Sequence, residues 1–206
     1  MTEQLAAPPI VEGGGERPDS VPPAIFEAAL ATFLAGRRLD MRALALQLGI
    51  GRATLYRKAG GRDWLLGEVI WYLTRRALVD ALERTVTLRG AERVLAVAGR
   101  FMAFVCDEAS FRRFLDEEPE AALRILTSKN GPVQRGIVEA QRRLLEEEQR
   151  IGGLELTIDS ATLAYVIVRI GESFLYADVI ADSEPDVEQA LEVMTRLIAP
   201  GRPVVT

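Results

Sequence analysis

Residues 39–66 read LDMRALALQLGIGRATLYRKAGGRDWLL, and this stretch decides the fold of the amino-terminal part of the chain. Asp40 can cap a short helix whose apolar positions face inward, and Gly49 suits the left-handed position that ends it. Ile50 then fills the turn, and a second short helix follows at once. Two short helices joined by so tight a turn predict a helix-turn-helix.

The second short helix carries the side chains that a DNA-reading helix needs. Leu55 is its core residue, so its other positions face outward. A major-groove helix needs donors for base edges and phosphates, and small residues where the backbone must come close to the DNA. The positions that supply them are Arg52, Ala53, Thr54, Tyr56, Arg57 and Lys58.

Positive charge is concentrated in the same stretch. Residues 37–62 hold one acid, Asp40, and seven bases: Arg37, Arg38, Arg42, Arg52, Arg57, Lys58 and Arg62. The local charge is +6 in a chain whose net charge is −5, so the remaining residues sum to −11. A basic surface on an acidic body is typical of a DNA-binding module joined to a regulatory domain, because neutralised phosphates supply most of the sequence-independent affinity. Arg42 is counted among the expected DNA contacts for this reason.

The rest of the chain is also predicted to be helical. Apolar residues follow helical spacing from residue 22 onward, and no segment alternates as a half-buried strand would. The expected helices lie at residues 22–36, twice within 40–58, and at 62–86, 91–107, 109–115, 119–128, 132–150, 159–181 and 185–199. We therefore predict an all-α chain with a three-helix helix-turn-helix domain at 21–66, a linking helix at 62–86, and a larger helical domain at 87–206.

The last two helices predict a homodimer. Segment 159–181 is apolar on nearly every side, so its helix must be surrounded. The core covers one side, and the same helices of a second copy most economically cover the other. The expected interface residues are Ala164, Val168, Leu175, Val187, Leu191, Met194, Leu197 and Ile198.

Residues 1–20 are predicted to form a mobile tail. They combine Pro, Gly and Glu with few large apolar side chains, so they cannot bury enough surface to offset the entropy of ordering. The alternative is a DNA-probing arm, which is disfavoured because Arg17 is the only base among four acids.

The composition excludes most enzyme chemistry. With no histidine and a single cysteine, Cys106, the chain cannot build a disulfide framework, a His/Cys zinc site or a His-assisted nucleophile. The run Glu146–Glu148 is interpreted as a solvated helix face, since consecutive glutamates on a helix cannot converge on one ion. We expect no catalytic residue, no metal and no cofactor.

The chain is expected to be soluble and cytoplasmic, without a membrane partner. Its first residues lack the basic start and apolar run of a signal peptide. Arg169 and Glu172 interrupt the most apolar later stretch, so that stretch does not predict a membrane span.

The segment GIGRATLYRKAGGRDWLL, residues 49–66, resembles the signature of the TetR family of bacterial transcriptional regulators. In that signature a Gly-apolar turn, a short helix with Thr-Leu-Tyr, and a basic-acidic pair that opens the fourth helix follow in this order. The resemblance covers about residues 22–70. It implies DNA-backbone or thymine contacts from Thr54 and Tyr56, base-edge contacts from Arg52, Ala53 and Arg57, and a phosphate held by Arg62 at a helix amino terminus.

Three positions depart from the family pattern. Gly51 and Gly61 stand where capping side chains are usual, which weakens two helix starts by about 1 kcal/mol each at most. Ala59 stands where an aromatic residue is usual, and Trp64 is expected to fill that space.

The resemblance also implies an effector pocket in the larger domain, where TetR-like proteins bind a small molecule that alters the spacing of two DNA-reading heads. Candidate pocket residues are Trp71, Tyr72, Phe101, Met102, Phe104, Cys106, Tyr165, Arg169, Glu172 and Tyr176. Each has an alternative as plain core, and Arg169 with Glu172 has an alternative as an ion pair.

Residues 114–148, FLDEEPEAALRILTSKNGPVQRGIVEAQRRLLEEE, are similar to the QsdR-like subgroup of the same family, which is linked to degradation of quorum-sensing lactones. The effector implied is a lactone or an apolar acid. The predicted function is a ligand-responsive homodimeric regulator, and specifically a repressor that a small molecule releases from a palindromic double-stranded operator. The alternative is an all-helical small-molecule receptor or adaptor whose DNA-binding head is vestigial.

Overall fold

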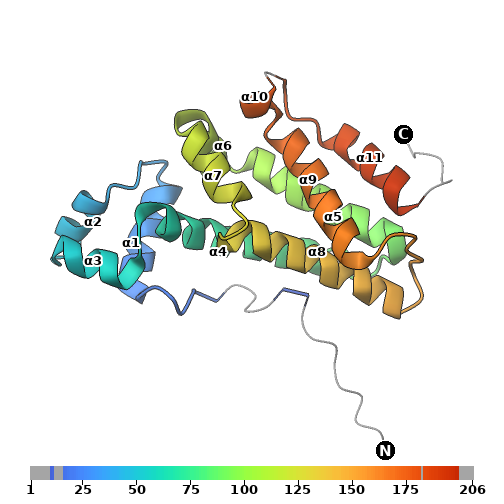
Figure 1. The fold of residues 1–206 in the computed structure, drawn as a ribbon, viewed down its shortest axis with the longest axis horizontal. Helices are drawn as coiled ribbons and strands as arrows, with labels where there is room; N and C mark the ends of the chain where they lie inside the picture. Colours follow the sequence, from blue (N-terminus) through green and yellow to red (C-terminus); the bar gives the residue numbers. More distant parts are fainter. Residues whose placement is uncertain (1–9, 12–15, 182, 200–206) are drawn as a thin grey trace, which may run out of the picture.

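The computed structural model describes residues 10–11, 16–181 and 183–199, and within them it contains eleven α-helices and no strand. The helices are α1 (Pro23–Leu34), α2 (Met41–Gln47), α3 (Arg52–Ala59), α4 (Arg62–Glu83), α5 (Gly90–Asp107), α6 (Ala109–Glu117), α7 (Pro119–Thr127), α8 (Pro132–Arg150), α9 (Ser160–Leu175), α10 (Ala177–Ile180) and α11 (Val187–Ile198). Helices α1–α3 form a head at one end of the molecule, and α4 runs from this head into a body formed by α5–α11 (Figure 1). The predicted all-α fold with an amino-terminal helix-turn-helix is confirmed.

The expected helix boundaries differ from the structure mainly in segment 159–181, which forms two helices. Tyr176 ends α9 with φ and ψ of −109° and 21°, and α10 then adds one further turn. The break places the Tyr176 side chain inside the body, where it is 5% exposed. Packing of this one ring therefore accounts for a break that helical periodicity alone did not indicate.

Residues close together in the sequence determine the ends of the helices in the helix-turn-helix. The Asp40 carboxylate accepts backbone N–H groups from two and three residues ahead, at 2.7 and 2.8 Å, and so caps α2. Gly49, with φ of 63°, takes the left-handed position that ends α2. Helices α3 and α4 begin after Gly51 and Gly61 without a side-chain cap.

The inner face of α3 is apolar and fully packed. Leu55 and Ala59 of α3 are buried, as are Leu65 and Leu66 at the start of α4. Trp64 lies against Gly60 and is 43% exposed.

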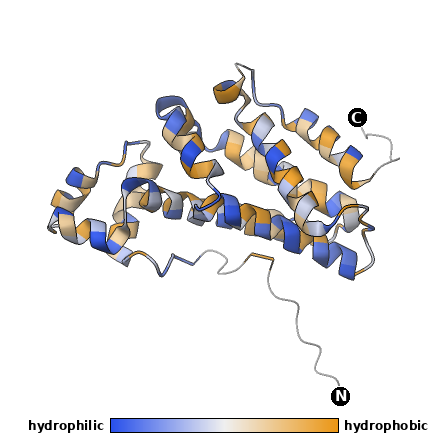
Figure 2. Cartoon of the chain, in the orientation of Figure 1, coloured by the Kyte–Doolittle hydropathy of each residue, from blue (hydrophilic) through white to orange (hydrophobic). Residues whose placement is uncertain are grey.

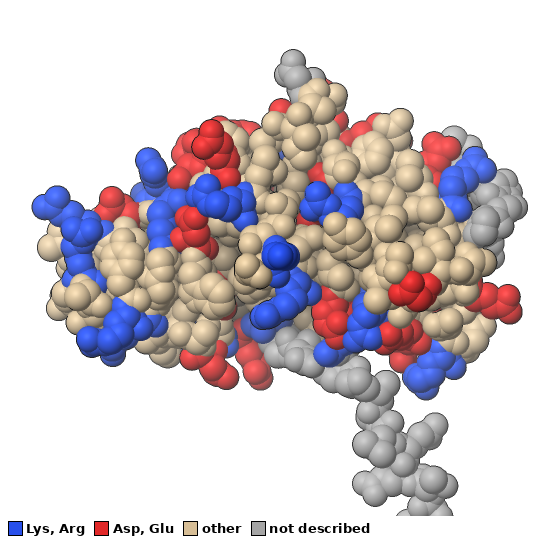
Figure 3. Space-filling model, in the orientation of Figure 1, with Lys and Arg blue, Asp and Glu red and all other residues tan. Residues whose placement is uncertain are grey.

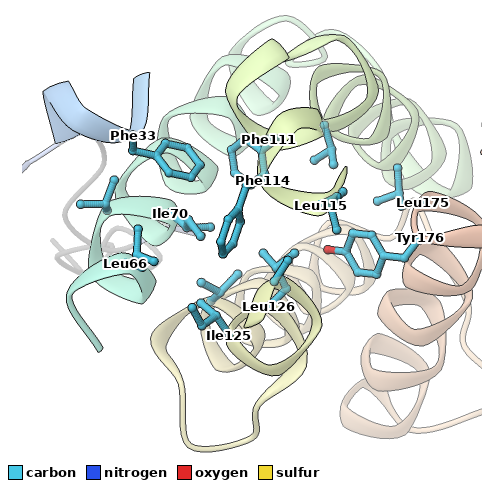
Figure 4. Packing of buried hydrophobic residues seen from close by; sticks show 14 of the residues in the cluster. Phe33, Leu66, Ile70, Phe111, Phe114, Leu115, Ile125, Leu126, Leu175 and Tyr176 are labelled. Atoms are coloured by element: carbon cyan, nitrogen blue, oxygen red, sulfur yellow. The ribbon is translucent and has the colours of Figure 1, made fainter. Parts of the chain in front are cut away.

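A continuous core joins the head to the body. The ring of Phe33 in α1 meets the rings of Phe111 and Phe114 in α6 edge-on, with centroids 5.8 Å apart in both pairs. Figure 4 shows these rings grouped near Ile70 of α4. Such edge-to-face pairs add about 1 kcal/mol each beyond the burial of their area. The head is therefore packed against the body and is not suspended on a linker.

The body packs around α4 and α9. Helix α4 contacts α5 and α8, while α9 lies between α8 and α11. Helix α8 alternates between hydrophobic and hydrophilic residues along its length (Figure 2), which fits one buried face and one exposed face. None of the described helices is long and apolar enough to cross a membrane.

Within the predicted tail, the structure describes residues 10–11 and 16–20, and these contact the body; residues 1–9 and 12–15 lie outside the described residues. Val11 is 7% exposed and packs with Leu78 of α4 and Ala140 of α8. The backbone carbonyl of Glu16 accepts a hydrogen bond from the Arg75 guanidinium. The few apolar residues of this segment thus pack against an apolar site on the body. The average composition of the segment did not indicate this packing.

Glu148 corrects the interpretation of residues 146–148 as a solvated face. Its side chain is fully buried, with 0% exposure, and accepts hydrogen bonds at 2.6 Å from both the Gly90 backbone N–H and the Arg93 guanidinium. Its neighbour Glu147 pairs near the surface with Arg150. Arg93 lies 55 residues from Glu148 in the chain, so local pattern did not indicate the pair.

We expect Glu148→Ala to lower the free energy of unfolding by about 3 kcal/mol, because it leaves the buried Arg93 guanidinium and the Gly90 N–H without their partner. Urea unfolding followed by circular dichroism measures the change. The matched control is Glu147→Ala, which removes a surface pair and is expected to cost less than about 1 kcal/mol. Equal losses for the two variants would contradict the assignment.

Candidate DNA-binding surface and effector cavity

Helix α3 presents a cationic outer face. Its predicted DNA contacts Arg52, Ala53, Tyr56, Arg57 and Lys58 are exposed, and Thr54 is partly buried. Basic side chains also gather at the α2–α3 end of the molecule in Figure 3. Arg42 is exposed at the start of α2. A short helix with a packed inner face and free donors outside can enter a major groove.

Arg62 has a different environment from the one that the sequence implied. Its Nε donates to the Leu39 carbonyl at 2.8 Å, and its Nη2 donates to both carboxylate oxygens of Glu118 at 2.5 and 2.7 Å. Arg38 approaches the same carboxylate at 3.3 Å. Glu118 precedes α7, so Arg62 ties the head to the body. Its Nε and Nη2 are engaged within the chain. The phosphate contact that the resemblance implies for Arg62 stays a prediction.

A largely apolar cavity with about 50 Å³ of free space lies inside the body between α4, α5, α8, α9 and α11. This free space is smaller than that of typical small-molecule sites. Four of the ten predicted pocket residues line the cavity: Phe101, Met102, Glu172 and Tyr176. Among the described residues, no group of three His, Cys, Asp or Glu side chains is placed to hold a metal ion.

The other six predicted pocket residues lie elsewhere. Trp71 and Tyr165 line a neighbouring groove, together with the basic residues Arg75, Lys129, Arg135 and Arg143. Tyr72 packs edge-on against Phe26, and Phe104 packs edge-on against Phe111. The Cys106 thiol is partly buried, which raises its pKa, and it lines neither site. Arg169 is 45% exposed and pairs with Glu172 from outside the cavity wall.

The groove is itself salt-bridged. Glu139 accepts hydrogen bonds from Arg142 and Arg143 at 2.7 Å, and the bond from Arg142 is the main cause that lowers the Glu139 pKa to about 2. Glu139 therefore remains a carboxylate under ordinary conditions and offsets part of the groove's positive charge.

The cavity wall has a small polar sector on α8, α9 and the residue that ends α9. Burial raises the pKa of Glu172 to about 7, although Arg169 and a hydrogen bond with Gln134 work against the shift. Burial also raises the pKa of Tyr176, whose hydroxyl is therefore neutral. Gln141 completes the sector, and its Nε2 has no hydrogen-bond partner among the described residues.

Sequence reasoning missed Gln141, Ile10 and Val11, all of which line the cavity. One signal was available for Gln141, because it stands four residues after Ile137 and three before Leu144, on the apolar face of α8. No local signal indicated that Ile10 and Val11 would cover the cavity.

The eight predicted interface residues mostly face the protomer's own core. Ala164, Val168, Leu175, Met194 and Ile198 are buried within one copy, and Val187, Leu191 and Leu197 are partly buried. The outward face of α9 and α11 is formed instead by Tyr165, Val166, Ile170, Phe174 and Val193, which are exposed or partly exposed. Apolar periodicity marked the side of these helices that the protomer buries, and it did not indicate which residues lie on their outer side. The interface on α9 and α11 stays a prediction.

The raised pKa of Glu172 predicts a pH-dependent stability. The folded protein holds this proton up to about pH 7, while the unfolded chain releases it near 4.5. Burial of Glu172 therefore costs more stability as the pH rises from 4.5 towards 7, and the cost is constant above that. We expect Glu172→Gln to gain roughly 2 kcal/mol relative to wild type between pH 5.5 and pH 8.

Urea unfolding of both proteins at the two pH values tests this expectation. The exposed Glu155→Gln is the control and should follow wild type at both. A stability difference between Glu172→Gln and wild type that does not change with pH would contradict the burial of a titrating carboxyl in the cavity.

Comparison with known proteins places the fold in a family. A family model described as the tetracyclin repressor-like C-terminal domain matches residues 89–199. The solved transcriptional repressor QsdR of R. erythropolis, from the TetR family, is 30% identical with a TM-score of 0.81, covering 88% of this chain and 96% of that chain. No curated protein matches the chain significantly.

Two further solved structures share the fold at lower identity. The TetR family repressor AlkX from Dietzia sp. strain DQ12-45-1b, implicated in biodegradation of n-alkanes, is 20% identical with a TM-score of 0.57, covering 88% of this chain and all (100%) of that chain. The regulator FadR from Bacillus subtilis, solved with stearoyl-CoA, is 14% identical with a TM-score of 0.55, covering 87% of this chain and 98% of that chain.

The family model covers more than half of the chain, and the similarity to QsdR extends over both the head and the body. These findings confirm the resemblance carried by residues 49–66, and they concern regulators rather than enzymes. The chain belongs to the TetR family of transcriptional regulators.

Proposed function

We propose that the protein is a homodimeric repressor that releases a palindromic operator when an apolar small molecule enters the body cavity. One observation carries the proposal: helix α4 connects the candidate DNA-binding helix α3 to the candidate effector cavity. The exposed cationic helix α3 is joined to the start of α4 through Gly60 and Gly61, and Leu78 and Leu82 of the same α4 line the apolar cavity. The related QsdR is a transcriptional repressor, which supports repression rather than activation as the role of this protein.

The charge distribution supports DNA as the partner of the head. Among the described residues, Arg52, Arg57 and Lys58 form no ion pair, whereas body arginines such as Arg84 and Arg142 are paired with carboxylates on their own helices. Unpaired cations on α3 are free to replace the counterions of phosphates. A vestigial head, the alternative function, gives no reason for an exposed helix to keep its bases unpaired.

A second copy supplies the second head that a palindromic operator needs. Helices α9 and α11 lie beside each other on one side of the body (Figure 1). We propose that their outward apolar face, which contains Ile170, Phe174 and Val193, packs against its symmetry mate.

The cavity is proposed as the effector site. Its apolar walls suit a molecule with an aliphatic or aromatic body, and the lactone and the apolar acid considered from sequence both have one. FadR, which shares the fold, is solved with stearoyl-CoA and so accommodates an acyl chain. An effector acts on DNA only if it favours a conformation in which the two heads no longer match successive grooves.

We expect Arg52→Ala and Tyr56→Ala each to weaken operator binding about tenfold or more, because each removes a contact made only by the outer face of α3. Fluorescence anisotropy with the DNA upstream of the gene, at two salt concentrations, measures affinity and the salt slope. The wild-type protein should bind in the nanomolar range with a steep slope. The control Arg150→Ala removes an exposed arginine at the far end of α8 and should leave both unchanged.

Wild-type affinity no better than for random DNA would favour the receptor or adaptor function. Unchanged operator affinity in Arg52→Ala and Tyr56→Ala would remove α3 as the reading helix.

We expect Val193→Glu to shift the protein from dimer to monomer, because it places a charge at the centre of the proposed interface. Val193 is 39% exposed in the protomer, so the substitution leaves the core intact. Sedimentation velocity measures the shift. Leu46→Glu is the control, because Leu46 is 74% exposed on the head and lies outside the interface. A dimer that persists in Val193→Glu would place the interface elsewhere.

A further inference from the structure

The groove lined by Trp71 and Tyr165 has room for a small organic molecule. Residues of α4, α8 and α9 line it, and it holds about 630 Å³ of free space. This volume falls within the range of small-molecule sites, whereas the free space of the body cavity falls below that range. Ile10 and Val11 line both spaces, so the groove and the cavity are adjacent.

Positive charge dominates the groove. Its lining residues include one acid, Glu139, and four bases: Arg75, Lys129, Arg135 and Arg143. One acid and four bases give the lining a net charge of +3. Glu68 interacts electrostatically with two of these bases, but its side chain is buried and does not line the groove. The groove is therefore cationic in a body that is acidic as a whole.

Two of the four bases are accessible and have no carboxylate partner. Lys129 and Arg135 are exposed, and neither forms an ion pair within the part of the chain that the structure describes. Arg142 of the same helix α8, by contrast, pairs with Glu139 and Glu146. A concave surface lined by charges of one sign concentrates their potential and attracts mobile ions of the opposite sign. The groove thus suits an anion.

Trp71 gives the groove an apolar surface beside these charges. A Cβ atom at Gly136 would overlap the Trp71 ring, so the glycine allows the indole to lie directly against α8. The Trp71 side chain is only partly buried and lines the groove. An aromatic surface next to ammonium and guanidinium groups suits a ligand that combines an apolar body with an anionic group.

We propose that the groove binds an organic anion, whose carboxylate or phosphate group pairs with Lys129 and Arg135 and whose apolar body lies on Trp71. The excess of positive charge favours a doubly charged phosphate over a singly charged carboxylate. The inference goes beyond the proposed function, because this site lies outside the body cavity and does not depend on an effector there.

Three naphthalene probes of similar size test the proposal on the full-length protein without DNA: 2-naphthyl phosphate, 2-naphthoate and 2-naphthamide. At about pH 7.5 they carry nearly two, one and no negative charges. We expect calorimetric titration to show the phosphate binding at least about tenfold more tightly than the amide, with the carboxylate in between. Raising NaCl from about 0.05 M to about 0.5 M should weaken the phosphate and leave the amide unchanged, because salt screens charge pairs.

Single substitutions locate the site. Lys129→Gln and Arg135→Gln should each weaken the phosphate about threefold and leave the amide unchanged, since both side chains are exposed and outside the core. Trp71→Leu should weaken all three probes, because it removes the surface that they share. The matched control is Arg100→Gln, which removes an exposed arginine of α5 outside the groove and should bind all probes as wild type does.

Equal affinity of wild type for the phosphate and the amide would overturn the proposal, and so would failure of all three probes to bind. A phosphate preference that neither Lys129→Gln nor Arg135→Gln reduces would overturn it as well. An equal loss in Arg100→Gln would reduce it to a general effect of net charge and so overturn it.

The operator titration separates this proposal from the proposed function. Lys129→Gln and Arg135→Gln should bind the operator as wild type does. Weakened operator binding in both would make the groove part of the DNA-binding surface and overturn the proposal. If wild type itself does not bind the operator while the phosphate preference holds, the repressor role is lost and the anion site stands.

Discussion

Helix α4 belongs to both the head and the body, so the position of the head relative to the body depends on this helix. At 22 residues it is roughly 33 Å long. Its first turns bury Leu65 and Leu66 in the core, and its later turns contribute Leu78 to the cavity wall. At Gly67 a side chain would come within 3.3 Å of Pro132, so the glycine lets α8 approach closely. The packing of α4 against the body therefore sets the orientation of the head.

A second connection runs through aromatic rings. Phe101 and Met102 of α5 line the cavity, and Phe104 of the same helix meets Phe111 of α6 edge-on. Phe111 in turn meets Phe33 of α1 in the head. Close-packed rings transmit displacement because the interior has little free volume. The rings therefore connect α5 to the head through contacts that do not involve α4.

Much of this architecture was predictable from local sequence. The features that were not predictable depend on contacts between residues far apart in the chain. The cap at Asp40 and the left-handed Gly49 depend on residues within a few positions of each other, so the helix-turn-helix could be recognised directly. Arg62 lies 56 residues from Glu118 in the chain, so no local pattern indicated their ion pair. Periodicity likewise assigned Met194 to an apolar face without showing that the protomer itself covers that face.

The Arg62–Glu118 ion pair links the two connections between head and body, the one through α4 and the one through the aromatic rings. Arg62 opens α4 and Glu118 stands between α6 and α7, so the pair joins the rod to the helix that carries Phe111. Both side chains are less than one quarter exposed, which strengthens their attraction relative to a surface pair. A rotation of α6 large enough to reorient the head must either carry Arg62 along or separate a bidentate ion pair. The pair therefore resists displacement of the head relative to the body, because separating it leaves two partly buried charges without their partners.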